Sequence, residues 1–464
     1  MSKLRPLVIL VTIVLVACSS NSGRSTATSP SSPPAPNPPT TSRTLSSAPP
    51  PTGTDWLAWG HDVSRSGVTN DGPSATGLRN VWTSASVDGD VYAQPLVVGS
   101  RVIVATANDS VYAFDAATGA TAWQQSIGTP VSASSLPCGN VDPVGITGTP
   151  VADPAANRLY VVGMIQPTHH ELFALALDTG AVVFHRPIDA GGADPAVHNQ
   201  RGALALANGR VYVPFGGRFG DCGNYKGRVV AVAPDGSGDP IEFAVRANRE
   251  GGFWAPPGPA IAPDGSVWLA AGNSDGRADF DEGNAVIRLT PDLKVADEFG
   301  PTDWARLNAV DGDVGTTSPV LLDDQHAFEI GKAGIGYLLD ATHLGGVGGE
   351  QKSAQICDRA NGGVAHDGNV VFIPCNNELH AVAVDSSGFH EQWTAGSAPG
   401  PAIVAGSLVW VLDVQVGVVH AFARDDGHEL FQSPVGEVTH FSSPAAGDGK
   451  VFVAGGRKVE AFGS

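Results

Sequence analysis

The chain has few basic and few aromatic residues. Lys and Arg number 27 against 46 Asp and Glu in 464 residues, which gives a formal net charge of −19. A surface this acidic repels phosphate backbones, so the composition argues against nucleic acid as a partner. Aromatic residues make up 7% of the chain, whereas glycine reaches 58 residues. Because no long run with a helical period is present, this balance predicts an all-β fold of short strands joined by turns.

Several catalytic signatures are also missing. The sequence contains no nucleotide-binding loop, no zinc-ligand pair and no nucleophile elbow. Residues 331–336 (GKAGIG) are rich in glycine, but they lack the spacing of a phosphate loop, and we interpret them as strand and turn. A hydrolase or a lyase would therefore need a catalytic set that no motif indicates.

The N-terminus has the pattern of an export signal. Lys3 and Arg5 precede an apolar run that ends at Val16, and a small residue comes before Cys18. The run is too short to span a bilayer, and the cysteine after it resembles a bacterial lipobox. We expect a signal peptide over 1–17 and a lipid on Cys18 that holds the protein on the extracytoplasmic face of the cell membrane. An ordinary signal peptide followed by a stray cysteine is the alternative.

Two further segments follow the expected signal peptide. Residues 18–54 are dominated by Ser, Thr and Pro, as in SPSSPPAPNPPTTSRTLSSAPPPTG. Such a stretch cannot bury enough apolar surface to fold, so we expect a disordered tether. Residues 55–464 have globular composition throughout and contain no second linker. This second segment is the predicted folded domain.

A hairpin pattern repeats along that domain. Residues 111–123 (VYAFDAATGATAW) combine a β-branched and aromatic strand, a turn with glycine and a return strand. The hairpin recurs at 172–184 and 418–431, each with an aromatic residue four positions after the turn glycine, and looser copies end at Trp393 and at the end of the chain. We expect Trp82, Trp123, Phe184 and Phe431 to pack where one repeat meets the next.

Two more strands precede most of these hairpins, which makes a unit of four. Four-stranded units repeated along a chain are typical of propeller blades. The pattern predicts eight units that start near Gln94, Gly148, Arg201, Pro257, Thr316, Gly362, Pro399 and Ser442. The eighth unit lacks a fourth strand, and residues 78–87 (LRNVWTSASV) supply a spare one. We therefore expect an eight-bladed β-propeller of four-stranded antiparallel blades, closed by this N-terminal strand.

The repeat resembles that of a known family. Ala113, Asp115, Thr118, Gly119 and Trp123 match the A-x-D-x-x-T-G-x-x-x-W repeat of quinoprotein-like propellers, the family of the pyrroloquinoline quinone dehydrogenases. Residues 55–67 (DWLAWGHDVSRSG) resemble the segment with which those proteins enter the first blade. The resemblance implies an eight-bladed fold. It does not imply one activity, because the same repeat builds non-catalytic scaffolds such as the lipoprotein of the outer-membrane barrel assembly machinery.

Features of the family's enzymes are missing here. Those enzymes carry two adjacent cysteines over the quinone, and the ones with a built-in haem also carry C-x-x-C-H, whereas this sequence has neither. We therefore expect no cofactor and a binding or scaffolding role. The alternative is a dehydrogenase of alcohols or sugars that uses pyrroloquinoline quinone with calcium.

The longer loops are predicted to gather on one face of the propeller. In each blade, the loop between the first and second strands and the loop between the third and fourth strands are short. The loops between the second and third strands and the connections between blades are long. Cys138, Cys222, Cys357 and Cys375 fall in these long loops. Four cysteines allow three pairings, and placement in neighbouring loops favours 138 with 222 and 357 with 375. Free thiols are the alternative.

Polar residues precede the inner strands and should converge at the mouth of the central channel on that face. They are Asp142, Thr147, His198, Asn199, Gln200, Arg201, Trp254, Asp313, Thr316, Thr317, Asn361 and His440. They could form a pocket for a small ligand or a peptide, with Arg201 as the partner of an anion and Trp254 as a stacking wall. Alternatively, they satisfy backbone groups of crowded loops.

An acidic loop is the one candidate for a metal site. Asp275, Asp279, Asp281 and Glu282 lie close together in the sequence and could hold calcium, although their spacing matches no EF-hand. A solvated acidic loop is the alternative. The sequence thus predicts a monomeric, membrane-anchored propeller that binds a protein or a small ligand through its long loops.

Overall fold

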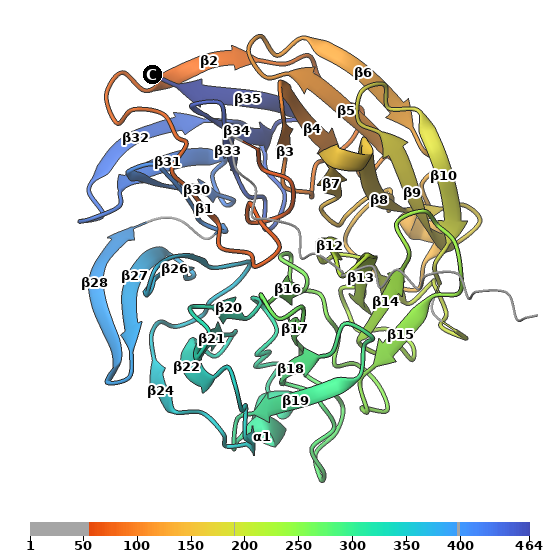
Figure 1. Ribbon diagram of the computed structural model, residues 1–464, viewed down its shortest axis with the longest axis vertical. Helices are drawn as coiled ribbons and strands as arrows, with labels where there is room; N and C mark the ends of the chain where they lie inside the picture. The colour runs from red at the N-terminus through yellow and green to blue at the C-terminus, as the bar shows by residue number, and fades with distance from the viewer. Residues whose placement is uncertain (1–54, 190, 397–399) are drawn as a thin grey trace, which may run out of the picture. The chain divides into compact units, whose positions relative to one another are not determined.

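The computed structural model describes residues 55–189, 191–396 and 400–464. The predicted signal peptide, Cys18 and the predicted tether lie outside the described residues. Strands dominate this part of the chain, and they form eight separate sheets arranged in a ring (Figure 1). The prediction of an eight-bladed, all-β propeller is confirmed.

Each sheet is one blade of four strands, which we name A to D from the centre outward. Blade 1 contains β3 (Leu96–Val98), β4 (Arg101–Ala105), β5 (Ser110–Asp115) and β6 (Thr121–Ser126). Blade 2 contains β7 (Val151–Asp153), β8 (Arg158–Ile165), β9 (His169–Ala176) and β10 (Val182–Pro187). Blade 3 contains β12 (Ala205–Ala207), β13 (Arg210–Gly217), β14 (Arg228–Val232) and β15 (Ile241–Ala244). Blade 4 contains β16 (Ala260–Ile261), β17 (Val267–Ala270), β18 (Val286–Leu289) and β19 (Val295–Gly300).

The remaining four blades continue in the same order. Blade 5 contains β20 (Val320–Leu321), β21 (His326–Ile330), β22 (Ile335–Asp340) and β24 (Lys352–Gln355). Blade 6 contains β25 (Ala365–Asp367), β26 (Val370–Pro374), β27 (Glu378–Asp385) and β28 (Gly388–Gly396). Blade 7 contains β29 (Ile403–Ala405), β30 (Leu408–Asp413), β31 (Val418–Ala423) and β32 (Glu429–Pro434). Blade 8 contains β33 (Ala445–Gly447), β34 (Lys450–Gly455), β35 (Lys458–Gly463) and β2 (Arg79–Thr83).

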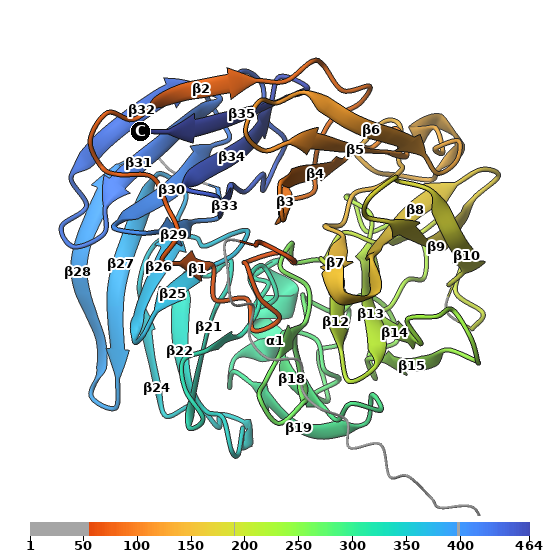
Figure 2. The same cartoon turned by 45° about the horizontal axis from the view of Figure 1, so that its top comes forward.

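The ring closes through the N-terminal strand, as the spare strand in the sequence predicted. Strand β2 pairs antiparallel with β35, with Trp82 opposite Ala461 (Figure 2). This pairing covers the outer edge of β35, which would otherwise expose unpaired backbone groups. The eight predicted blade starts all fall just before the observed A strands.

A few short elements lie outside this scheme. Strand β1 (Val68–Thr69) runs parallel to β29, and β11 (His198–Asn199) pairs with the end of β13. Strand β23 (Gly346–Val347) belongs to a longer C–D connection in blade 5 and pairs with β19 of blade 4. The helical elements are η1 (Ala133–Ser135), η2 (Pro154–Ala156) and α1 (Trp304–Ala309).

The C–D turn explains the repeat in the sequence. In blade 1 the Asp115 carboxylate accepts hydrogen bonds from the Ala117 and Thr118 amides and from the Thr118 hydroxyl. Gly119 follows in the left-handed conformation at φ 72°, which disfavours any residue with a side chain. A bulge then places Trp123 opposite the small Ala113. The repeat therefore encodes one turn and one position for a large ring.

Candidate functional site

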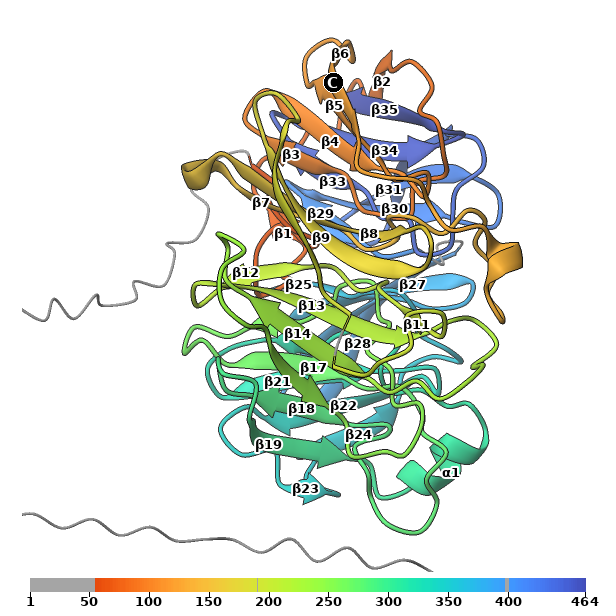
Figure 3. The ribbon, with the colours of Figure 1, turned by 90° about the vertical axis from the view of Figure 1, so that its right-hand side faces the viewer.

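The long loops gather on one face of the propeller. This long-loop face consists of the B–C loops and the blade-to-blade connections, including α1 and the loop that carries η1 (Figure 3). Two disulfides staple it: Cys138 with Cys222, and Cys357 with Cys375. Both predicted pairings are confirmed. Cys138 lies in the connection from blade 1 to blade 2 and Cys222 in the B–C loop of blade 3, whereas Cys357 lies in the connection from blade 5 to blade 6 and Cys375 begins the B–C loop of blade 6. Each disulfide therefore ties a blade-to-blade connection to a B–C loop.

A crossing segment, residues 56–67, fills the centre of the ring at the end of the A–B turns. The Leu57 carbonyl accepts from Ala152 of blade 2, and the Ser66 carbonyl accepts from His366 of blade 6. Trp56 exchanges backbone hydrogen bonds with Val97 of blade 1, and its Nε1 donates to Gln94 Oε1 at 2.9 Å. The segment therefore joins A strands on opposite sides of the ring.

Arg65 anchors the crossing segment from within. It is 3% exposed, and its guanidinium donates to the carbonyls of Trp59, Leu204 and Pro259 at 2.9 to 3.0 Å. Burial lowers the pKa of Arg65 to about 10, so it stays charged at neutral pH. For the nearby Asp62, burial alone would raise the pKa, but the neighbouring His61 and hydrogen bonds from Ser64 and Ser66 hold it well below its ordinary value.

Aromatic rings and cations alternate on the long-loop side of the ring. The Arg201 guanidinium lies 5.4 Å from the centroid of Tyr92 and 5.2 Å from that of Phe441. Phe441 lies 6.3 Å from Trp254, and Lys332 Nζ lies 5.6 Å from the Trp254 ring. These cation–π contacts join residues of several blades into one mouth cluster.

The mouth cluster ends in a buried ion pair. Lys332 Nζ lies 2.5 Å from Asp313 Oδ2 and 2.7 Å from Asp311 Oδ1. Asp313 is 2% exposed, and its other oxygen accepts from the Asn273 amide at 2.5 Å. Burial alone would lower the pKa of Lys332, but the two carboxylates raise it above its ordinary value. Lys332 therefore carries a fixed positive charge beside Trp254.

The predicted ligand-binding residues divide into groups. Arg201, Trp254 and Asp313 lie in the mouth cluster, and His440 supplies the carbonyl that accepts from Arg201 Nη2 at 2.8 Å. By contrast, Thr147 donates to the Gln200 carbonyl and Thr316 donates to the Ala360 carbonyl, both within the loops.

Some other predicted residues are engaged within their own loops. His198 and Asn199 form β11, and the His198 ring packs on Tyr225. Asp142 accepts from the Ala133 amide beside η1. Thr317 donates to Glu329, and Asn361 Oδ1 lies 3.5 Å from Arg359 Nε.

The acidic loop does not assemble into a cluster. Asp281 accepts from Ser274 Oγ, whereas Glu282 is fully buried and lies 2.8 Å from Arg246. Burial raises the pKa of Glu282 to about 7, against the opposing effect of Arg246. In the described part of the chain, no three His, Cys, Asp or Glu side chains form a group that could hold a metal ion. This geometry gives the calcium expectation no support.

Sequence reasoning missed Tyr92, Lys332, Phe441 and Arg65. Tyr92 and Phe441 come shortly before the predicted blade starts Gln94 and Ser442. An aromatic residue at this place is the sequence signal that indicates them. Lys332 lies in the GKAGIG stretch, which was interpreted only as strand and turn. Arg65 lies in the segment that resembles the family's entry to blade 1. The local sequence around Arg65 does not indicate a hydrogen bond to a residue as distant as Pro259.

Together, the eight blades and their C–D repeat define an eight-bladed propeller whose repeat is similar to that of quinoprotein-like proteins. A family model described as Outer membrane protein assembly factor BamB matches residues 74–252, which confirms the resemblance of the repeat. The Outer membrane protein assembly factor BamB of Burkholderia pseudomallei (strain K96243) is 34% identical over 115 residues. That stretch covers 24% of this chain and 29% of the relative.

Solved structures are similar over most of the chain. The quinohemoprotein alcohol dehydrogenase from Comamonas testosteroni has a TM-score of 0.68 at 15% identity and covers 89% of this chain and 81% of its own. BamB from Moraxella catarrhalis has a TM-score of 0.54 at 15% identity and covers 83% of this chain and 98% of its own. At this identity the likeness shows the fold, which an enzyme and an assembly factor share.

One feature concerns the membrane. Within residues 55–189, 191–396 and 400–464, none of the helices has the length and apolar character that crossing a bilayer requires.

Proposed function

We propose that this chain is an extracytoplasmic binding module, held at a membrane by a lipid on Cys18, whose long-loop face docks a protein partner. The exposure of large apolar side chains carries the proposal. In the described residues, three such side chains are more than half exposed: Phe219 at 73%, Val416 at 68% and Val310 at 59%. All three lie on the long-loop face. A contiguous apolar patch with a polar rim marks an interaction site, and we propose that these three side chains contribute to one such contact surface.

The scaffold beneath these side chains supports the proposal. Phe219 lies in the B–C loop that Cys222 ties to Cys138, and Val310 directly follows α1. Loops that are fixed in advance lose little conformational freedom when a partner binds. The relative from Burkholderia pseudomallei carries a name that refers to outer membrane protein assembly, and a role in assembly also requires contact with other proteins.

Photo-crosslinking in cells tests the docking face. A photoreactive residue is introduced singly in place of Phe219, Val310 or Val416, and in place of Val183 and Leu430 as controls. Val183 and Leu430 are 44% and 42% exposed, but they lie on outer strands. We expect the three loop positions to crosslink to one shared partner and the controls to give none. Crosslinks from the outer strands alone, or none from the loops, would overturn the proposal.

The anchor is tested separately. Cys18→Ala removes the sulfur that would carry the lipid, so the variant should leave the membrane fraction and appear in the soluble fraction. Cys18→Ser should behave identically, because serine also lacks the thiol. Unchanged membrane retention of both variants would contradict lipidation without affecting the docking face.

A dehydrogenase that uses pyrroloquinoline quinone is the second candidate, and the mouth cluster favours it. Trp254 offers an aromatic surface, and Lys332 and Arg201 supply positive charge near it. Such a set fits a planar polycarboxylate, which would bring hydride-accepting chemistry when bound. In the described part of the chain, no three His, Cys, Asp or Glu side chains gather there to hold the accompanying calcium. The test is reconstitution with pyrroloquinoline quinone and calcium, followed by dye reduction with alcohols and aldoses. Turnover would favour the enzyme.

A further inference from the structure

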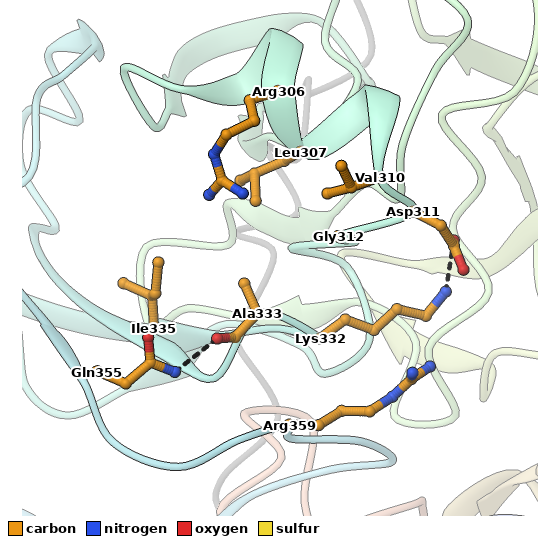
Figure 4. A pocket seen from close by; sticks show the side chains of 10 residues that line it. All are labelled: Arg306, Leu307, Val310, Asp311, Gly312, Lys332, Ala333, Ile335, Gln355 and Arg359. Carbon is orange, nitrogen blue, oxygen red and sulfur yellow. Dashed lines mark hydrogen bonds and ion pairs between the residues drawn. The ribbon is translucent and has the colours of Figure 1, made fainter.

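A pocket lies beside the mouth cluster on the long-loop face. Its volume is about 350 Å³, which is near the lower end for small-ligand sites. Three segments surround it: α1 with the loop after it, the turn between β21 and β22, and the stretch that follows β24 (Figure 4). Two of these segments are blade-to-blade connections and the third is a B–C loop. We call this cavity the basic pocket.

The cations that line the basic pocket differ in how far nearby carboxylates already neutralise them. Arg306, Lys332 and Arg359 line it, with Asp311 as the one carboxylate among its lining residues. Arg306 is paired with Asp303 at 3.0 Å, and Lys332 is paired with both Asp311 and Asp313. Among the described residues, the Arg359 guanidinium has one weak contact, from Nε to Asn361 Oδ1 at 3.5 Å. Arg359 is therefore the cation of this cavity that is left to bind an anionic ligand.

The orientation of Arg359 strengthens this inference. Figure 4 shows its guanidinium extending toward the ammonium group of Lys332 and the carboxylate of Asp311. The charge of Lys332 is already balanced by Asp311 and Asp313, so an added anion would pair with the Arg359 guanidinium. An arginine fork with free N–H groups can bind both oxygens of a carboxylate.

The opposite wall is apolar and preformed. Leu307, Val310 and Ile335 line it, and Val310 is 59% exposed. Across from them, Gln355 Nε2 donates to the carbonyls of Ala333 and Cys357 at 2.7 and 2.6 Å. Cys357 is fixed in turn by its disulfide to Cys375. The pocket therefore combines a charged side with an apolar side in a rigid frame.

We propose that the basic pocket binds a small organic carboxylate, whose charged group pairs with Arg359 and whose apolar body packs on Val310, Leu307 and Ile335. The site shares Val310 with the proposed docking face, but binding of a small molecule can be measured without a protein partner. The site would make the propeller a receptor for a small anion in addition to a docking module.

Isothermal titration with simple probes tests the proposal. Benzoate supplies a carboxylate on an apolar ring, benzamide is its neutral counterpart, and inorganic phosphate is an anion without an apolar body. We expect benzoate to bind at least 10-fold more tightly than either of the others, and its affinity to fall as salt is added. Equal affinity for benzoate and benzamide, or tighter binding of phosphate, would overturn the proposal.

Variants locate the binding. Arg359→Gln should weaken benzoate binding by 10-fold or more, and Val310→Asp should do the same by placing a negative charge at an exposed position. Arg101→Gln is the matched control, because Arg101 begins β4 beside an A–B turn on the other face. Circular dichroism confirms that each variant is folded. If both pocket variants bind benzoate like the control, the basic pocket is not the site.

Discussion

Trp123 of blade 1 lies against Gly180 of blade 2. The indole Nε1 donates to the Leu177 carbonyl at 3.0 Å, and a Cβ on Gly180 would lie 2.5 Å from Cε3 of the ring. The same contact joins Trp82 to Gly119 and Trp393 to Gly427. In blade 2, Phe184 takes this position over Gly236. The turn glycine of each such blade therefore has two roles: it adopts a left-handed conformation and it receives the ring of the previous blade.

Trp123→Ala should lower the free energy of unfolding by about 3 to 5 kcal/mol, because the ring is buried and nothing else fills its place. Gly180→Ala should destabilise as well, because its methyl group clashes with the ring and φ is 73°. In the double variant the clash is absent, so its loss of unfolding free energy should be smaller than the sum of the two single losses. Urea denaturation of the three variants measures this, and strict additivity would contradict the contact.

Arg65→Met should destabilise the domain strongly. The variant keeps the apolar stem but leaves the carbonyls of Trp59, Leu204 and Pro259 without their donor, and each orphaned acceptor costs about 1 to 3 kcal/mol. Arg79→Met on the exposed part of β2 is the control and should change stability by less than about 0.5 kcal/mol. The measurement is the midpoint of thermal unfolding. Similar midpoints for the two variants would mean that the crossing segment does not depend on Arg65.

Stability should fall as pH rises because of Asp109. This carboxyl group is fully buried without a hydrogen-bond partner, and burial, reinforced by the charge of Asp88, raises its pKa to about 8. The unfolded chain releases this proton near pH 4, whereas the folded chain keeps it until about pH 8. Between pH 4 and pH 8 the free energy of unfolding should therefore fall by at most about 1.4 kcal/mol per pH unit because of this group.

Asp109→Asn removes this dependence. Asparagine tolerates the left-handed backbone at φ 56°, so the substitution adds no backbone strain. The stability of the variant minus that of wild type should be larger at pH 8 than at pH 4. Glu329→Gln should behave similarly, because burial raises the pKa of Glu329 to about 8 despite the hydrogen bond from Thr317. Chemical denaturation across this pH range gives the difference between each variant and wild type. A constant difference would contradict the assignment.

The two disulfides should differ in their effect on stability. Cys138 and Cys222 are separated by 84 residues, whereas Cys357 and Cys375 are separated by 18. In the chain-entropy view, a longer closed loop restricts the unfolded state more. Replacing the first pair by serine should cost about 4 to 5 kcal/mol, and replacing the second should cost about 3 kcal/mol. Thermal unfolding of the two double variants compares them, and the reverse order would contradict this account.

The blades were predictable from sequence because each depends on local chemistry. Turn residues, alternating strands and the ring at Trp123 repeat within short stretches, and Trp82 identified the strand that closes the ring. The disulfides followed from the placement of their loops. The crossing segment was not predictable, because Arg65 binds carbonyls that only the closed ring brings together. The basic pocket has the same origin, since Arg306, Lys332 and Arg359 converge from three separate loops.

The closure of the ring constrains the order of folding events during synthesis. Trp82 lies on a strand whose partner ends at Gly463, and the A strand beside β1 starts at Ile403. Because contacts between distant parts of a chain form slowly, β1 must remain without β29, and β2 without β35, until the last blades emerge. A chain arrested before β35 would expose Trp82 and the edge of the final sheet together. The N-terminal strands would therefore need protection by chaperones for a longer time than the blades in the middle of the domain.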